Sequence, residues 1–245
     1  MWKCFFIFLI IQLAAMPGFA GAGRALFPGP DTALVVHPCK DFRITGKGRN
    51  AQWKKAPWVD LQKLDTAGTA YKSRFKILYS VTGVYVLFDG ADARVSSSFK
   101  KDFEKLFLGD VFEVFFHPEP SLPAYFEYEV SPLDKELVLL LGRQNGRMAA
   151  QPPPLYEGRK KVQKAVHITG GEMQPGAAIQ SWTAELFFPY ELLSTFQNMP
   201  PAKGTQWRAN FCRLDYDSGA MVKWAWAPVQ ESFHELHRYY TLVFN

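Results

Sequence analysis

Cysteine is scarce in this sequence, and the features of membrane proteins and nucleic-acid-binding proteins are missing. Only three cysteines occur among the 245 residues. After the first 22 residues no apolar run is long enough to cross a bilayer, so no membrane anchor is expected. Basic residues are scattered apart from a GRKK cluster at 158–161, which is typical of a solvated loop. No nucleic-acid partner is therefore expected.

The common catalytic signatures are also missing. The chain contains no Ser-His-Asp pattern, no HExxH and no phosphate-binding loop. It has no alternation of strands and helices, no internal repeat and no low-complexity tract. These absences argue against most enzyme classes and against an α/β fold.

The N-terminal segment resembles a secretory signal. Lys3 gives a positive start, residues 5–15 form an apolar run, and small residues follow it. This pattern predicts a signal peptide over residues 1–22, with cleavage after Ala20 or Ala22. We therefore expect a secreted or periplasmic protein.

The cysteine positions bear on both anchoring and crosslinking. Cys4 lies before the apolar run and not after it, so a lipid anchor is not expected. Cleavage would leave Cys39 and Cys212, which an exported chain could join in a disulfide. Such a bridge would stabilise the domain by about 4–5 kcal/mol in the chain-entropy model. Two buried free thiols are the alternative, and the count does not choose between them.

Short strand-like segments separated by turns dominate the rest of the chain. A hairpin is indicated by residues 75–81 and 84–89, which flank a Thr82-Gly83 turn. Further strands are expected at 110–117, 125–131, 136–141, 162–168, 182–188, 207–215, 222–226 and 240–244, with turns at 142–146 and 190–196. We predict an all-β protein with little helix: a single antiparallel β-sandwich of immunoglobulin-like or jelly-roll type over residues 39–245. Residues 23–38 are expected to form a leader strapped across it.

Two acidic strands show how the predicted sheet is oriented. Side chains alternate across a strand, so each segment has an apolar set and an acidic set. The apolar set is predicted to face the core: Phe112, Val114, Phe116, Phe126, Tyr128 and Val130. The opposite face then carries Glu113, Glu127 and Glu129 among apolar neighbours. This face is either an ordinary solvated surface or a concave surface for a polar ligand with apolar patches.

Carbohydrate is the ligand class that suits such a face. Carboxylates and arginines hold sugar hydroxyls in fixed directions. Aromatic rings cover the apolar faces of sugar rings. Aromatic residues make up 16% of the chain, enough for a core or a binding platform, so composition alone does not choose between these roles.

Seven motifs occur in the order seen in family 9 carbohydrate-binding modules. They are ITGKGRNAQWKKAPW, GVYVLFDGAD, GDVFEVFFHPE, YFEYEVSP, SWTAELFFPYELL, GTQWRANFCRLDYD and SFHELHRYYTLVF. The chain from about Cys39 onward most resembles the exported bacterial family 9-like branch of the DOMON-like β-sandwiches. The resemblance implies a noncatalytic module whose partner is an oligo- or polysaccharide, and such modules can carry structural calcium.

The resemblance also implies a set of binding residues. The family carboxylate falls on Glu113, and the two tryptophans that clamp the sugar fall on Phe107 and Phe233. An arginine of sugar-binding members falls near Glu129, which reverses the charge.

Three further positions complete this set. An amide on the family's late strand falls near Cys212, with Arg213 beside it. Phe233 and His234 match the Phe-His pair of the family 9-like branch. The predicted site is an aromatic-rimmed cleft in which Arg213 or ligand hydroxyls satisfy Glu113. Its ligand-binding residues are Phe107, Glu113, Glu129, Arg213, Phe233 and His234.

Three other functions fit parts of the sequence. A module of the same fold could bind a partner protein. Glu113 with Glu127 or Glu129 could form a glycosidase pair, which needs carboxyl groups about 5–10 Å apart. A haem domain would need axial ligands chosen from Met148, Met173, Met221, His117, His167 and His234, but no spacing selects a pair. The sequence does not indicate the oligomeric state.

Overall fold

The computed structural model describes residues 32–144, 147–197 and 199–245. The predicted signal peptide lies outside these residues. None of the helices in the described ranges is long and apolar enough to cross a membrane. The described residues form a nearly all-β fold, as predicted.

Fourteen strands occur within the described residues: β1 (Ala33–Pro38), β2 (Val59–Asp60), β3 (Gln62–Lys63), β4 (Ser73–Tyr79), β5 (Gly83–Ala91), β6 (Val111–His117), β7 (Tyr125–Val130), β8 (Glu136–Gln144), β9 (Arg147–Gln151), β10 (Gln163–Thr169), β11 (Ser181–Pro189), β12 (Gln206–Asp215), β13 (Val222–Ala225) and β14 (Tyr240–Phe244). Four short 3₁₀ helices accompany them: η1 (Ala51–Lys55), η2 (Leu106–Leu108), η3 (Gly158–Lys160) and η4 (Leu236–Arg238). Each strand expected from the sequence is present, and the hairpin β4–β5 turns at Thr82 as predicted. The turn expected at 142–146 includes 145–146, which lie outside the described residues, and β8 extends through Gly142.

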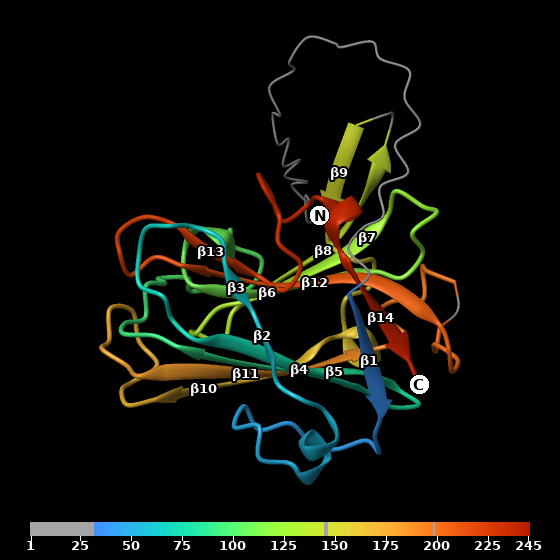
Figure 1. Ribbon diagram of the computed structural model, residues 1–245, viewed down its shortest axis with the longest axis horizontal. Coiled ribbons are helices and arrows are strands. Elements are labelled where there is room, and N and C mark those ends of the chain that lie inside the picture. Colours follow the sequence, from blue (N-terminus) through green and yellow to red (C-terminus); the bar gives the residue numbers. More distant parts are fainter. Residues whose placement is uncertain (1–31, 145–146, 198) are drawn as a thin grey trace, which may run out of the picture.

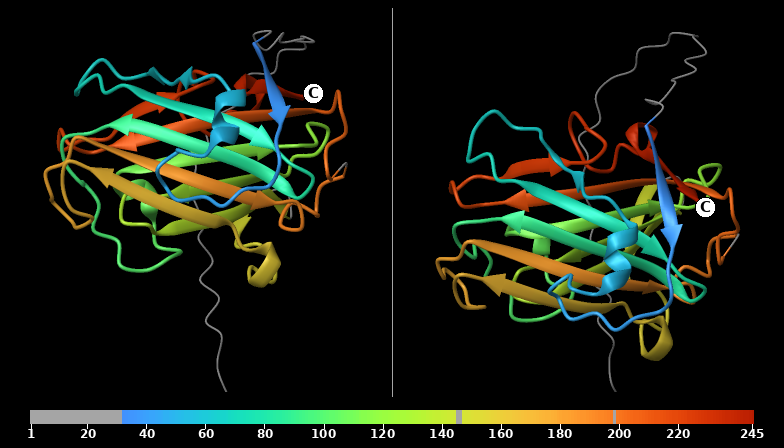
Figure 2. Two further views of the ribbon diagram at one scale, coloured as in Figure 1. Left: turned by 90° about the horizontal axis from the view of Figure 1, so that it is seen from below. Right: turned by 60° about the horizontal axis from the view of Figure 1, so that its bottom comes forward.

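The strands form two layers (Figure 1). One layer, sheet A, has the order β14-β12-β6-β7-β8-β9, and β13 pairs with β12. The facing layer, sheet B, has the order β10-β11-β5-β4. Figure 2 shows sheet B from outside, with η1 and its neighbouring loops lying over it.

Strand β1 joins the two layers. It pairs in parallel with β14 of sheet A and with β4 of sheet B, whereas the other strand pairs are antiparallel. Residues 33–38 are therefore a strand of the sandwich, and the expected leader contains part of the fold. The boundary predicted at residue 39 was too late, because strand pairing with segments far along the chain is invisible locally.

The space between the layers is the main core. It includes the six residues predicted to face inward, each with no solvent exposure: Phe112, Val114, Phe116, Phe126, Tyr128 and Val130. Their alternation in β6 and β7 matches the pairing register, in which Val114 lies opposite Tyr128. The pleat prediction is confirmed.

The outer side of each sheet is also covered. Trp53 and Ala56 from the segment containing η1 pack on Leu78, Tyr85 and other residues of sheet B. Residues 229–239, which we call the cap, pack on the outer side of sheet A. The structure therefore has apolar clusters outside both sheets in addition to the core between them.

The predicted disulfide is absent, because both cysteines are free. Cys39 packs in the cluster outside sheet B, and Cys212 belongs to the cluster outside sheet A. A crosslink would have to pass through the sandwich. Burial raises the pKa of the Cys39 thiol to about 11 and raises that of Cys212 as well, so both thiols are protonated near neutral pH.

Candidate functional site

Three glutamates lie together on the outer face of sheet A. Glu113 of β6 is directly opposite Glu129 of β7, and Glu127 is two residues away on the same face of β7. Their neighbours on adjacent strands are apolar: Cys212 beside Glu113, and leucines of β8 beside the other two. The sequence pattern thus folds into a compact carboxylate cluster with apolar surroundings.

The cap and η2 bury this cluster. Glu113 is 3% exposed, Glu127 5% and Glu129 1%. Phe233 from the cap packs near Phe115, with ring centroids 6.2 Å apart. Phe107 from η2 packs against the same apolar cluster outside sheet A, and its backbone N–H donates to Glu129. The expected solvated or open concave face is instead a covered one.

Hydrogen bonds hold the cap in place. The side chain of Asn210 in β12 donates to the Ala227 carbonyl at 2.9 Å and accepts from the Ala227 N–H at 2.8 Å. Within the cap, Glu235 Oε1 accepts the N–H groups of residues 230, 231 and 232. Tyr239 O–H donates to the Phe233 carbonyl at 2.8 Å. The cap is therefore an ordered turn structure, and the chain just before it is anchored to β12.

Burial and mutual repulsion make the glutamates reluctant to ionise. Burial raises the pKa of Glu113 well above its usual range, and repulsion from Glu127 adds to this effect. The pKa of Glu129 is raised by burial and then by both neighbouring glutamates. Burial also raises the pKa of Glu127 to about 7, although contact with Glu129 opposes the shift. The cluster holds protons near neutral pH.

His234 lies at the edge of the cluster but is not its cation. Its Nδ1 is 2.9 Å from the Tyr125 hydroxyl and 4.0 Å from Glu127 Oε2. The second distance is too long for a hydrogen bond. Burial lowers the pKa of His234, which disfavours the charged imidazolium. His234 is therefore mainly neutral at pH 7.

Five of the six predicted binding residues are brought together. Phe107 and Phe233 contribute to one apolar cluster, and Glu113, Glu129 and His234 lie beneath or beside it. The family 9 resemblance assigns the two rings and Glu113 to one sugar site, and that assignment stays a prediction. The open cleft is not present in this closed arrangement.

Arg213 is the residue that the structure separates from this group. Because Cys212 faces outward beside Glu113, its neighbour Arg213 points into the sandwich. There its guanidinium donates to Asp92 at 3.0 Å and to Asp215 at 2.7 Å, with no solvent exposure. Gly90 leaves room for it, since a Cβ there would lie 2.7 Å from Arg213 Nη1. The expected Arg213–Glu113 contact is therefore wrong.

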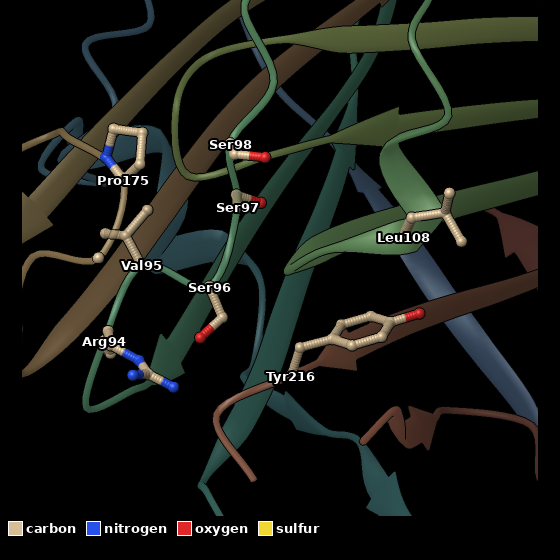
Figure 3. Close-up of a pocket in the computed structure, with 9 residues that line it drawn as sticks. Arg94, Val95, Ser96, Ser97, Ser98, Leu108, Pro175 and Tyr216 are labelled. Atoms are coloured by element: carbon tan, nitrogen blue, oxygen red, sulfur yellow. The ribbon is translucent and has the colours of Figure 1, made fainter. Parts of the chain in front are cut away.

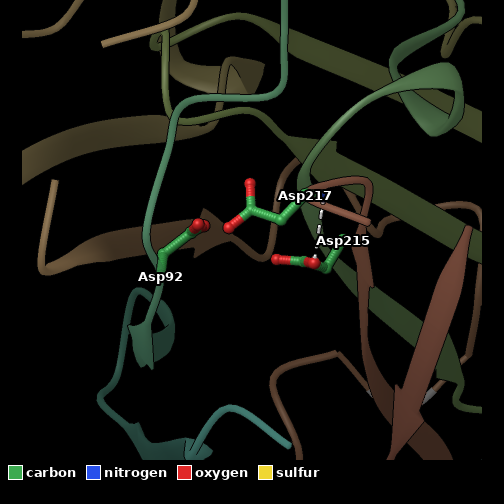
Figure 4. Close-up of side chains that lie close together, drawn as sticks. All are labelled: Asp92, Asp215 and Asp217. Atoms are coloured by element: carbon green, nitrogen blue, oxygen red, sulfur yellow. Dashed lines mark hydrogen bonds between the residues drawn. The ribbon is translucent and has the colours of Figure 1, made fainter. Parts of the chain in front are cut away.

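The aspartates around Arg213 form the one group of possible metal ligands found among the described residues. Asp92, Asp215 and Asp217 converge in Figure 4, and one carboxylate oxygen from each lies within 4.8 Å of the others. The guanidinium of Arg213 already bonds two of them, and Asp217 accepts from Tyr71 and Ser96 hydroxyls. A calcium ion among these oxygens would be held against a permanent cation. The donor set therefore does not fit the calcium that the family resemblance allows.

A hollow of about 350 Å³ opens beside η2 (Figure 3). Its walls include Arg94, Leu108, Tyr216 and three consecutive serines, 96–98. The Tyr216 hydroxyl donates to the Phe107 carbonyl at 2.6 Å. Burial raises the pKa of Tyr216, and Glu113, Asp110 and Glu129 add to this shift. Tyr216 thus borders both the hollow and the carboxylate cluster.

Sequence reasoning missed three parts of this site. Asn210 of β12 bonds the backbone of Ala227, which lies just before the cap. The group of three aspartates had only two signs in the sequence: the spacing of Asp215 and Asp217, and the GVYVLFDGAD motif that ends at Asp92. Tyr125 and the cap meet through a contact between residues 109 positions apart, which no local pattern contains. The methionines considered as haem ligands, Met148, Met173 and Met221, are all exposed.

No family model and no curated protein matches the sequence. Solved structures do share its fold. A candidate carbohydrate-binding protein from Bacteroides uniformis ATCC 8492 is 16% identical, with a TM-score of 0.66 over 87% of this chain and 99% of that one. A family 9 carbohydrate-binding module from Caldicellulosiruptor kristjanssonii in complex with cellotriose is 13% identical, with a TM-score of 0.61 over 87% and 94% of the chains. The same kind of module from that organism in complex with glucose is 12% identical, with a TM-score of 0.60 over 87% and 96%. At these identities the likeness is one of fold.

Proposed function

We propose that this protein is a noncatalytic carbohydrate-binding module. One observation supports the proposal: the chain shares the fold of sugar-bound family 9 modules, and its Phe107 and Phe233 belong to one apolar cluster on the face of sheet A that carries Glu113. Aromatic rings suit the apolar faces of sugars, and a carboxylate accepts bonds from their hydroxyls. Export through residues 1–22 belongs to the same proposal, because extracellular polysaccharides are reached outside the cytoplasm.

The closed cap sets a condition on binding. A sugar reaches Glu113 only after cap residues move, since that carboxylate is 3% exposed. Phe233 and His234 belong to the moving segment, whereas Phe107, Glu113 and Glu129 lie on the sheet side. The cap would then close one wall of the site over the bound sugar.

A glycan array followed by calorimetry tests the proposal. We expect at least one oligosaccharide to bind, and Glu113→Gln to weaken its binding by about 1–3 kcal/mol, because the amide keeps the shape but replaces one oxygen that can accept a hydrogen bond with an NH₂ donor. The exposed Glu172→Gln is the matched control. If the identified sugar binds Glu113→Gln as well as wild type, that carboxylate is not a contact.

A hydrolysis screen separates binding from catalysis. The noncatalytic assignment expects no turnover of any sugar that binds. Turnover by wild type that vanishes in Glu113→Gln would instead assign the carboxylates a catalytic role. Capture of a periplasmic protein with no array signal would favour a protein-interaction module.

A further inference from the structure

The carboxylate cluster has no basic partner. None of the lysines and arginines that the structure describes lies within 4.0 Å of a carboxylate oxygen of Glu113, Glu127 or Glu129. Apart from contact between the two carboxyl groups themselves, Glu127 Oε2 and Glu129 Oε2 have no hydrogen-bond partner. Buried polar atoms are normally paired, so these two oxygens require an explanation.

Another buried glutamate shows what a structural carboxylate in this protein looks like. Glu185 on the outer side of sheet B has no solvent exposure. Its Oε1 accepts from the Trp53 indole N–H at 2.7 Å, and its Oε2 accepts from Thr45 N–H at 2.7 Å and from the Thr45 hydroxyl at 3.2 Å. Both oxygens are satisfied by groups that cover that sheet. Glu127 Oε2 and Glu129 Oε2 have no such donor, although Glu129 accepts the Phe107 N–H and both residues are buried to a similar degree.

The groups around the cluster supply no positive charge. Burial keeps the Cys212 thiol and the Tyr125 and Tyr239 hydroxyls protonated, and it disfavours the charged form of His234. The walls are aromatic, with Phe107, Phe115 and Phe233 around the carboxylates. An acidic site with aromatic walls suits a cation, since carboxylates attract it directly and ring faces attract it through their negative charge density.

We propose that the site takes an amine-bearing sugar, in which a protonated amine bonds to Glu127 and Glu129. The inference rests on the proposed carbohydrate-binding function and narrows its substrate class. An ammonium group carries three donors and one positive charge. It would satisfy the unpaired oxygens and offset the repulsion among three carboxylates, which a neutral sugar hydroxyl cannot do. The bound amine takes the place of the protons that the cluster otherwise holds.

Three tetrasaccharides with the same β-1,4 backbone test the proposal. They are the glucosamine tetramer, its fully N-acetylated counterpart and cellotetraose, which differ only in the substituent at the second carbon. Binding is measured by calorimetry with the purified protein at about pH 5.5, where most of the amines of the glucosamine tetramer are protonated. We expect the glucosamine tetramer to bind at least about tenfold more tightly than either of the others.

Two variants locate the effect. Glu129→Gln keeps the side-chain shape and should reduce the preference for the amine to less than about threefold. Glu172→Gln makes the same chemical change on an exposed loop and should leave the preference unchanged. Glu127→Gln provides a second variant of the cluster if Glu129→Gln does not fold. A preference retained in both cluster variants would overturn the proposed contact.

The outcomes separate this inference from the proposed function. If cellotetraose or the N-acetylated tetramer binds as tightly as the amine, the amine proposal is wrong and carbohydrate binding stands. If none of the three binds, the amine proposal is again wrong, and the glycan array decides the proposed function independently. If spermidine competes as strongly as the glucosamine tetramer, the site recognises amines and not amino sugars, which also overturns the inference.

Discussion

Single side chains in this protein decide how stability depends on pH. The folded protein raises the pKa of Glu127 to about 7, above the value of an unfolded glutamate near 4.3. Between these two values the folded state binds more protons than the unfolded state. Stability contributed by this group is therefore complete below about pH 4 and is lost as the pH rises through 7.

The first prediction is that Glu127→Gln flattens this dependence. Wild type should lose on the order of 1–3 kcal/mol more stability than the variant between about pH 5 and pH 8, measured by urea unfolding. Glu172→Gln should follow wild type, because its side chain is exposed. Burial also raises the pKa of Asp92 to about 8 and that of Asp110 to about 7. These two groups make stability fall with rising pH in the same way in all three proteins. Identical slopes in wild type and Glu127→Gln would show that Glu127 ionises as in the unfolded chain.

Arg213 is a second single residue on which the stability of the fold depends strongly. It is the buried donor to Asp92 and Asp215, and its removal would leave both buried carboxyl groups without this hydrogen-bonded partner. We predict that Arg213→Leu lowers the free energy of unfolding by about 3–5 kcal/mol at pH 7. The exposed Arg43→Leu should change it by less than about 0.5 kcal/mol. Equal stability of Arg213→Leu and wild type would contradict the internal ion-pair role.

At the scale of elements, the cap packs on sheet A and also carries two of the proposed binding residues, Phe233 and His234. Phe233 is 8% exposed and packs with Phe115 and Tyr239 against sheet A. We predict that Phe233→Ala destabilises the protein by about 2–4 kcal/mol, because it leaves a cavity under the cap. It should also speed hydrogen exchange in residues 229–239 while β6 keeps its protection. Phe103→Ala, which removes a 43% exposed ring, is the control. An unchanged melting temperature for Phe233→Ala would mean that the cap does not depend on this ring.

The sequence predicted elements well where the signal was local. The strand segments follow from apolar runs between turn residues, and the core faces of β6 and β7 follow from strict alternation. The same alternation, applied to β12, would have placed Arg213 on the opposite face from Cys212, so that error was avoidable. The burial of Glu113 was not predictable in this way, because the cap that packs on the outer side of sheet A comes from a distant part of the chain.

At the scale of the whole molecule, the fold and the site carry separate information. The sandwich is shared with structures only 12–16% identical to this chain, so the fold depends on pattern and tolerates most residue changes. Packing alone does not require the carboxylates outside sheet A, because an apolar outer face would pack equally well under the cap. Their presence there is what directs attention to a ligand.

The closing prediction concerns β1, which pairs with both sheets and should make them unfold together. Val36 points into the core with no exposure, whereas its neighbour Val35 is 43% exposed. We predict that Val36→Ala lowers the free energy of unfolding by about 2 kcal/mol and that Val35→Ala changes it by less than about 0.5 kcal/mol. In each protein, tryptophan fluorescence and far-ultraviolet circular dichroism should report one common midpoint, because neither sheet loses β1 without exposing core residues of the other. Separate midpoints would show that the sheets unfold independently, and equal losses from the two valines would show that β1 does not present alternate faces to core and solvent.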